Sequence, residues 1–336
     1  MYMKSIISAT VCAVTLSFAA PQTQAADYSI KFAHNNPPLE TSSYHRYYKK
    51  FAELAAKYTD GKVEFREFPS SQMGSDQQMA KKLQLGSIEM IAVAANNLAQ
   101  LYGGFDLFTL PFLIKSPKCA VQTVLKDEKL IRMISEGAQK KANIRVLAFS
   151  NGGARNMMNS KHPILSPADL KGLRMRVAKN PILLDTYAAL GADAIGISAA
   201  ETYGALQTKV VDGHDGGTAW AFAQKLHEVQ NFYSLTGHQL VTLAVIINND
   251  YFEKLPADVQ AGITKAAKEA AAENMEWMLA YESKVFDTFK DAGLKFSSPD
   301  LAPFQNAVSS VWEKYAERVG GKDVIDYVKG LQGSCS

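Results

Sequence analysis

A long helical segment constrains the fold of this chain more than any other part of the sequence. Between Pro256 and Ala292, apolar residues recur mostly three, four or seven positions apart, which gives a helix one apolar face. Pro256 suits the first turn of a helix, and Gly293 suits its end. At 1.5 Å per residue such a helix is roughly 55 Å long, which exceeds the width of one small domain. The segment therefore predicts a protein of two parts, with this helix lying across both.

Strands and helices alternate along the rest of the chain. Before residue 150, the apolar patterns predict strands at 28–34, 63–68, 88–95 and 144–149, and helices at 42–58, 76–85 and 116–142, the last broken near Asp127. After Ser150-Asn-Gly-Gly-Ala154 the alternation restarts, with strands expected at 155–159, 174–177, 210–211 and 240–247, and helices at 181–190, from 198 and around Trp220. This alternation of strands and helices predicts an α/β fold. The sequence contains no Gly-x-Gly-x-x-Gly motif of the dinucleotide-binding type after a strand.

The first 25 residues have the composition of a secretory signal peptide. Lys4 supplies the positive end, residues 6–20 form an apolar run, and Thr23-Gln-Ala25 offers small residues for cleavage, while a retained anchor is the alternative. The formal net charge of +3 falls by one when Lys4 leaves with the peptide. This balance gives no argument for nucleic acid as a partner, and we expect no direct membrane insertion after cleavage.

Two cysteines remain in the mature chain, Cys119 and Cys335, because Cys12 lies inside the signal peptide. In an oxidising compartment such a pair can form a disulfide that closes a very long loop. Two free thiols are the alternative, since a sequence does not show whether two α-carbons come within ~7 Å.

A short stretch at 166–177, Ser-Pro-Ala-Asp-Leu-Lys-Gly-Leu-Arg-Met-Arg-Val, contains the first candidate for chemistry. Leu173, Met175 and Val177 alternate with Arg174 and Arg176, the period of a strand with one buried face. The two arginines therefore point away from that face. Two solvated arginines are one interpretation, and an arginine that reaches into a cleft and binds a carboxylate with its planar fork is the other.

Gly-Leu-Arg-Met-Arg-Val resembles the signature of the DctP-like family, the substrate-binding proteins of tripartite (TRAP-type) transporters for organic acids. Four further stretches match in the same order, at 69–75, 110–112, 201–207 and 211–213, so the resemblance covers essentially the whole mature chain. It implies a two-lobe periplasmic binding protein of α/β class, with mixed sheets, an interlobe cleft and a long spine helix. We place the crossings between lobes near 152, 240 and 280, which assigns 26–152 with 241–280 to lobe 1, and 153–240 with 281–336 to lobe 2.

The same resemblance implies the residues that bind the ligand in lobe 2. The second arginine of the motif fixes the ligand carboxylate in this family, and Arg176 matches it directly; a buried structural ion pair is the alternative. Arg155 follows Asn-Gly-Gly-Ala and resembles a second family arginine near the ligand, with a charge at the rim as the alternative. In the loop Asp212-Gly-His-Asp-Gly-Gly217, Asp215 is expected to accept a hydrogen bond from a ligand hydroxyl group. Gly216 leaves space, and Trp220 is expected to wall the pocket or to pack in the core.

Polar residues near expected strand ends or helix starts supply the lobe 1 candidates. Open α/β sheets bind ligands outside the carboxyl ends of their strands, and amides and carboxylates there suit hydroxyl groups. The candidates are Asn35, Asp76, Gln77, Asn96 and Asn97, each of which also has an alternative role as a cap or turn residue.

These observations predict a periplasmic protein that captures an organic acid anion, a sugar acid or a C4-dicarboxylate, by closure of its lobes and delivers it to the membrane subunits of a TRAP transporter. We expect no cofactor, no metal and no catalysis. Two alternatives remain: a periplasmic enzyme that uses His214 and Asp215, and a ligand-sensing partner of a membrane receptor. The sequence determines neither the ligand nor the oligomeric state.

Overall fold

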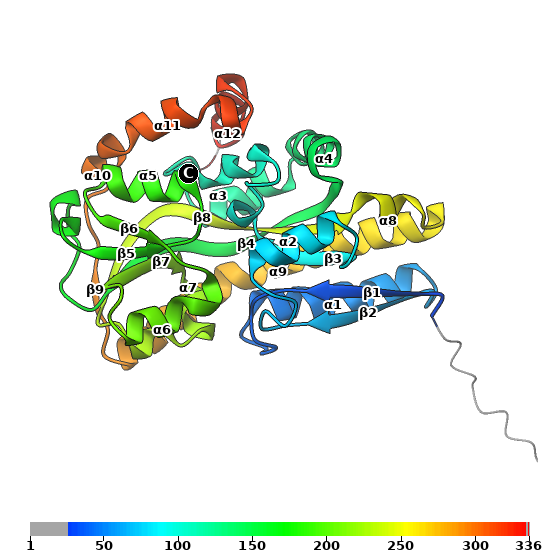
Figure 1. Cartoon of the computed structure of the whole chain (residues 1–336), viewed down its shortest axis with the longest axis horizontal. Coiled ribbons are helices and arrows are strands. Elements are labelled where there is room, and N and C mark those ends of the chain that lie inside the picture. Colours follow the sequence, from blue (N-terminus) through cyan, green and yellow to red (C-terminus); the bar gives the residue numbers. More distant parts are fainter. Residues whose placement is uncertain (1–25, 334, 336) are drawn as a thin grey trace, which may run out of the picture.

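Two long antiparallel strands form the centre of the protein in a computed structural model that describes residues 26–333 and 335. β4 (Ile144–Asn159) and β8 (Phe232–Asn248) pair along their length, from Ile144 beside Asn248 to Asn159 beside Phe232. Figure 1 shows that further strands flank them on both sides. The expected signal peptide, residues 1–25, lies outside the described residues.

One mixed sheet of nine strands is built on this pair, in the order β2-β1-β3-β8-β4-β7-β5-β6, with β9 beside β8. The remaining strands are β1 (Tyr28–Ala33), β2 (Val63–Phe68), β3 (Met90–Ala94), β5 (Arg174–Val177), β6 (Asp193–Gly196), β7 (Gly213–Gly217) and β9 (Lys295–Ser297). β1, β2 and β3 pair in parallel at one end of the sheet, and β5, β6 and β7 pair in parallel at the other. We call these the β1–β3 end and the β5–β7 end.

Helices cover the sheet and connect its strands (Figure 1). They are α1 (Ser43–Tyr58), α2 (Asp76–Gln84), α3 (Pro117–Gln122), α4 (Glu128–Ala142), α5 (Pro181–Ala189), α6 (Thr202–Gln207), α7 (Thr218–Ala223), α8 (Asn249–Glu253), α9 (Ala257–Asp291), α10 (Ala302–Ala307), α11 (Ser309–Tyr315) and α12 (Lys322–Leu331). The expected break near Asp127 is confirmed, because the Asp127 side chain accepts a hydrogen bond from the Leu130 N–H and caps α4. No helix within residues 26–333 is both long and apolar enough to cross a membrane.

The long helix expected at 256–292 is confirmed as α9, which packs against α1, β4 and α7. Its buried face contains several small residues, among them Gly262, Ala266 and Ala270. A β-carbon at Gly262 would lie 2.7 Å from the backbone oxygen of Tyr58, so glycine is required for this approach of α9 to the end of α1. Figure 1 shows the helix running from beside α8, at the right of the view, toward α6 at the lower left, so that it spans the molecule as the length of the segment predicted.

The expected interruption at 150–154 differs from what is observed. The sequence predicted two separate strands, whereas β4 runs through, and only its register against β8 shifts, between Asn151 and Ala154. Gly153 has φ +91°, a conformation that glycine adopts without strain, so the chain bulges and then resumes pairing. The proposed crossings at 152 and 240 fall at this irregularity, and the residue bounds of the two lobes stay a prediction.

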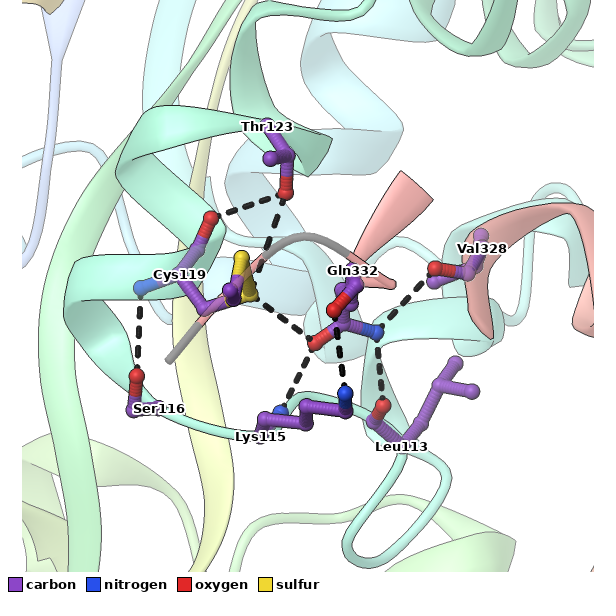
Figure 2. The surroundings of a disulfide bond; sticks show 8 residues. Leu113, Lys115, Ser116, Cys119, Thr123, Val328 and Gln332 are labelled. Carbon is purple, nitrogen blue, oxygen red and sulfur yellow. Dashed lines mark hydrogen bonds between the residues drawn. A yellow bond between two sulfur atoms is a disulfide. The ribbon is translucent and has the colours of Figure 1, made fainter. Parts of the chain in front are cut away.

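A disulfide joins Cys119 of α3 to Cys335, with their α-carbons 5.6 Å apart. Figure 2 shows Gln332 beside it, in a network that connects the last turn of the chain to the loop before α3. The Gln332 Nε2 donates to the Leu113 carbonyl at 3.0 Å, and its Oε1 accepts from the Lys115 N–H at 2.8 Å. Of the two alternatives that the sequence left open, the structure thus contains the disulfide.

This disulfide closes a loop over a separation of 216 residues, so its removal is expected to destabilise the protein. We predict that Cys335→Ser lowers the free energy of unfolding by about 2 to 4 kcal/mol, measured by urea denaturation without reductant. Cys119→Ser should give the same loss, and a reductant should bring the wild type to the level of either variant. Equal stability of the wild type with and without reductant would contradict the prediction.

Candidate ligand-binding site

A cavity of about 470 Å³, including the part open to solvent, lies between the two ends of the sheet. Its wall from the β1–β3 end is mostly polar, and its wall from the β5–β7 end contains two arginines and a tryptophan. The lining residues are Asn35, Ser43, Tyr44, Asp76, Ala94, Asn96, Asn97, Gly152, Arg155, Arg176, Ala178, Ala199, Gly217, Trp220 and Val241. The cavity therefore combines residues from sequence segments up to about 200 positions apart.

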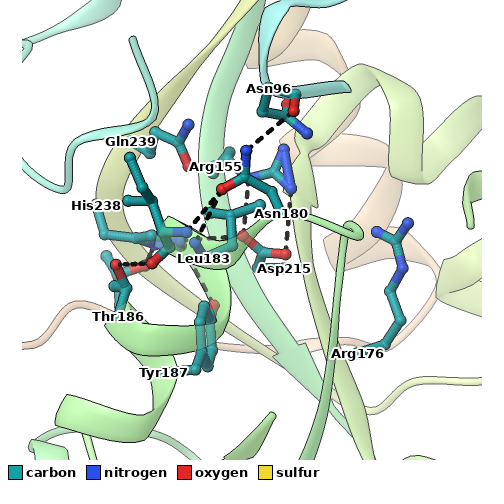
Figure 3. Close-up of polar contacts among 12 residues, drawn as sticks. Asn96, Arg155, Arg176, Asn180, Leu183, Thr186, Tyr187, Asp215, His238 and Gln239 are labelled. Carbon is teal, nitrogen blue, oxygen red and sulfur yellow. Dashed lines mark hydrogen bonds and ion pairs between the residues drawn. The ribbon is translucent and has the colours of Figure 1, made fainter. Parts of the chain in front are cut away.

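Arg176 on β5 is a buried cation without a carboxylate partner in the part of the chain that the structure describes. Its side chain is almost fully buried, and its Nε and Nη2 donate to the Ile197 carbonyl at 2.9 and 2.7 Å. No carboxylate in the described part of the chain lies within 4.0 Å of it, and the guanidinium lies 5.4 Å from the centre of the Trp220 ring. Burial lowers the pKa of Arg176 to about 10. Figure 3 shows its side chain standing apart from the polar cluster around Arg155.

Arg155 on β4, by contrast, is already neutralised. Its Nε and Nη2 donate to the two oxygens of Asp215 at 2.7 and 3.2 Å, and both side chains are buried. The His238 Nε2 lies 3.4 Å from the same carboxylate (Figure 3). Burial opposes ionisation of Asp215, but Arg155 and His238 outweigh it and hold the pKa of this carboxyl well below its usual range. Arg155 thus lines the cavity, and Asp215, which lies behind the cavity wall, already balances its charge.

The opposite wall is organised around Asp76, the first residue of α2. Ser75 caps this helix, which places the Asp76 side chain beside the carboxyl ends of β1 and β3. The Asn35 Nδ2 lies 2.9 and 2.8 Å from the two Asp76 oxygens, and the Asn97 Nδ2 donates at 2.6 Å. Burial raises the pKa of Asp76 to about 6, although Asn35 and Arg176 act against this shift. This wall therefore offers amide groups and a carboxyl group to a ligand.

The position of the Trp220 ring on α7 requires a glycine at position 216 on β7. A β-carbon at Gly216 would lie 2.7 Å from the Trp220 ring, so only glycine leaves room for the indole at this position. The ring of His214 meets the same indole edge-on at 5.9 Å between centres. Residues 213–217, expected as a loop, thus form strand β7, which helps to hold the tryptophan against the Arg176 guanidinium, where the ring shields the charge from water.

The structure brings most of the expected site residues together at one cavity. Those that line it are Arg176, Arg155, Asn35, Asp76, Asn96, Asn97 and Trp220. Three expected residues lie behind the wall instead. Asp215 is paired with Arg155, Gly216 packs under Trp220, and the Gln77 amide donates to Asn97 at 3.3 Å. Whether any of these residues contacts a ligand stays a prediction.

Tyr44 is the largest lining residue that sequence reasoning missed. It occupies the first turn of α1, is almost fully buried, and lines the cavity beside Asn35 and Asp76. An aromatic residue at a helix start is a weak signal, because helices place aromatic residues in the core at the same spacing. Only the packing of α1 beneath β1 shows that this ring belongs to the cavity.

The pair on which the enzyme alternative depended is not formed. His214 packs on Trp220, whereas the adjacent Asp215 on the same strand contacts Arg155 and His238. No hydrogen bond joins the two side chains, because successive residues of a strand point to opposite faces. Within residues 26–333 and 335, no group of three or more His, Cys, Asp or Glu residues is arranged to hold a metal ion.

Comparison with known proteins shows the family of this chain. The model of the bacterial extracellular solute-binding protein family 7, DctP, matches residues 32–318. The chain belongs to this family. The expected family and the two-lobe α/β fold class are thereby confirmed, and the role of the family is the binding of solutes outside the cytoplasm.

Relatives cover nearly the whole chain. The C4-dicarboxylate-binding periplasmic protein DctP of Rhodobacter capsulatus is 32% identical over 330 residues, 96% of this chain and 97% of that protein. The 2,3-diketo-L-gulonate-binding periplasmic protein YiaO of Escherichia coli K12 is 30% identical over 335 residues, 99% and 100% of the two chains. A TRAP periplasmic solute-binding protein of Roseobacter denitrificans, solved with bound β-D-glucuronate, matches with a TM-score of 0.84 and 27% identity over 91% of this chain and 99% of its own.

The raised pKa of Asp76 has a consequence for stability. Its folded-state pKa of about 6 lies above the ordinary value of 3.8, so between about pH 4 and 6 the native state holds a proton that the unfolded state releases. We predict that Asp76 costs the ligand-free protein on the order of 2 to 3 kcal/mol as the pH rises through this window.

Urea denaturation of the wild type and Asp76→Asn at several pH values measures this effect. The variant should lose that part of the pH dependence and become more stable than the wild type above pH 6. Glu253→Gln, which removes an exposed carboxylate 3.1 Å from Arg145, is the matched control and should keep the wild-type slope. An unchanged slope in Asp76→Asn would show that the buried carboxyl titrates normally.

Proposed function

We propose that this protein is the periplasmic solute-binding component of a TRAP transporter and that it captures an organic acid anion between the two ends of its sheet. Family membership and the ligands of its relatives, a C4-dicarboxylate and β-D-glucuronate, support this function. On this proposal the expected signal peptide delivers the chain to the periplasm, and the transporter's membrane subunits are the partner. The protein binds its ligand and does not convert it.

One observation carries the proposal: the buried Arg176 guanidinium has no carboxylate partner in the described chain. Transfer of an isolated charge from water into a protein interior is costly unless a counter-charge comes with it. A carboxylate in the cavity supplies that counter-charge, and its two oxygens fit the planar guanidinium. Because the Ile197 carbonyl and the Trp220 ring already orient the guanidinium, little further ordering is required when the anion binds.

The wall opposite Arg176 favours a hydroxylated monoacid such as a sugar acid. Asn35 has a buried Oδ1 without a partner among the described residues, so it can accept a hydrogen bond from a ligand hydroxyl group. Asp76, when ionised, also accepts such bonds and repels a second carboxylate. We assign the hydroxyl groups to this wall rather than to Asp215, because each oxygen of Asp215 already accepts a hydrogen bond from Arg155.

A C4-dicarboxylate is the second candidate, supported by the relative from Rhodobacter capsulatus. Such a ligand fits if Asp76 binds as a neutral acid, which its raised pKa favours below about pH 6. The two ligand classes therefore differ in their expected dependence on pH. A sugar acid should bind at pH 8, whereas a dicarboxylate should bind more tightly as the pH falls toward 5.

The proposed mechanism is closure of the two lobes on the ligand. Arg176 and Arg155 contribute from the β5–β7 end, and Asn35, Asn97 and Asp76 contribute from the β1–β3 end. A ligand that contacts both walls stabilises the closed form, because only contacts made more strongly in that form shift the equilibrium. The membrane subunits would then recognise the closed form.

The test is a thermal-shift screen of residues 26–336 against small organic acids, including D-glucuronate and succinate at pH 5 and pH 8. A ligand at a hundred times its dissociation constant stabilises the native state by about 2.7 kcal/mol, which gives a measurable rise in melting temperature. We expect shifts from acids and none from neutral sugars. Shifts from neutral sugars alone would reject the organic-anion proposal.

Arg176→Ala tests the proposed anchor by calorimetric titration with the acid found in the screen. We predict at least about thirtyfold weaker binding, because removal of one partner of a buried charge pair costs about 2 to 5 kcal/mol. Arg174→Ala is the matched control, since Arg174 lies on the same strand but donates to Asp212 at 3.0 Å and does not line the cavity. Wild-type affinity in Arg176→Ala would move the carboxylate site elsewhere.

A further inference from the structure

The spine helix α9 buries two polar side chains among its thirteen buried residues, Asn274 and Glu282. All the others are apolar or glycine, as expected for a helix that packs against α1, β4 and α7. Buried polar groups are costly unless they are hydrogen-bonded, so each of these two is expected to have a specific partner. Each of the two has a partner on β4, and these two contacts lie on opposite sides of the β4 bulge at Asn151–Ala154.

Asn274 contacts β4 before the bulge. Its Nδ2 donates to the Ser150 Oγ at 3.0 Å, and that hydroxyl in turn donates to the Ala271 carbonyl at 3.3 Å. The Asn274 side chain does not line the cavity. It therefore attaches the helix to a part of β4 that precedes the site.

Glu282 contacts β4 after the bulge and two turns further along α9. Its Oε1 accepts from the Ala154 N–H at 3.2 Å and from the Thr218 Oγ1 at 2.8 Å. The side chain is 9% exposed, and a β-carbon at Gly153 would lie 3.3 Å from the same oxygen. One carboxylate oxygen therefore connects the end of the bulge to the first residue of α7.

The two residues that donate to Glu282 lie next to residues of the cavity. Ala154 directly precedes Arg155, and Thr218 directly follows Gly217, which pairs with Arg155 across β4 and β7. Trp220, which flanks Arg176, lies two positions beyond Thr218 in α7. The position of the Glu282 oxygen thus affects the backbone that aims Arg155 and the helix that presents Trp220.

We propose that Glu282 is a positioning residue of the ligand site, which acts through the β4 bulge and the start of α7 to aim Arg155 and Trp220 into the cavity. The effect on affinity rests on the proposed function, whereas the effect on the orientation of Trp220 does not. An acceptor at this distance is required, because alanine leaves the Ala154 N–H without a partner and leaves the Thr218 hydroxyl only the Tyr233 hydroxyl, 2.8 Å away. Glutamine keeps a carbonyl oxygen in the same place.

Ligand affinity provides the first test. Glu282→Ala should raise the dissociation constant for the acid found in the screen at least tenfold, and Glu282→Gln should restore it to within about threefold of the wild type. Asn274→Ala, which removes a buried hydrogen bond from the same helix on the other side of the bulge, is the matched control. It should lower the melting temperature and leave the affinity within threefold.

A double-mutant cycle with Arg155→Lys shows whether Glu282 acts through Arg155. If it does, Glu282→Ala should weaken binding much less in the Arg155→Lys background than in the wild type. Additive losses, or an equal loss of affinity in Asn274→Ala, would overturn the proposal and leave Glu282 a general stabiliser of the fold. If Glu282→Ala does not fold, Thr218→Val removes one of the two donors and should give a smaller loss in the same direction; wild-type affinity there would also overturn it.

The fluorescence of Trp220 provides a test that needs no ligand. With Trp277→Phe and Trp312→Phe, Trp220 is the one tryptophan left in the chain. Its emission maximum and its quenching by acrylamide should change in Glu282→Ala and stay unchanged in Asn274→Ala and Glu282→Gln. An unchanged Trp220 signal in Glu282→Ala would overturn the positioning role. If the wild type binds none of the acids, the proposed function fails, and this measurement still decides on Glu282.

Discussion

The antiparallel pairing of β4 with β8 is the constraint on which the rest of the structure depends. β8 pairs with β3 of one end and β4 pairs with β7 of the other, so the position of one end relative to the other depends on the backbone hydrogen bonds between β4 and β8. α9 packs against β4 and spans the same length. The bulge at Asn151–Ala154 interrupts this pairing at the level of the cavity, where Gly152 and Arg155 form part of the wall.

The charged side chains around the cavity differ in the partners that surround them. Arg155 is balanced by Asp215, and Asp76 is held by amide groups of Asn35 and Asn97, but Arg176 has a carbonyl group and an aromatic ring as its neighbours. A buried ion pair contributes little net binding energy, since desolvation offsets the attraction. Arg176 has no carboxylate partner among the described residues, so on the proposed function a ligand supplies its counter-charge. This difference explains why two arginines in one cavity can have different roles.

The C-terminal segment shows how a distant part of the chain supports this arrangement. The Arg318 Nε donates to the buried Asp106 at 2.6 Å, and Asp106 in turn accepts from the Asn180 amide. Asn180 also donates to the backbone carbonyl of Asn96 beside the cavity (Figure 3). Together with the disulfide at Cys335, these contacts attach the last helices to the segment that forms the polar wall.

The sequence by itself determined the family of this protein and most of its helices and strands before residue 292, but not the continuity of β4 or the strand β7. The periodicity of α9, the apolar strands and the arginine motif on β5 are local patterns, and local patterns follow from side-chain spacing along one helix or strand. Only the tertiary structure decided which polar groups pair. Asp215 balances Arg155 from 60 positions away, Glu282 reaches Ala154 from 128 positions away, and Tyr44 joins the cavity through the packing of α1. Such partners depend on how the chain crosses between the two ends of its sheet, and the spacing of residues along the sequence does not predict that path.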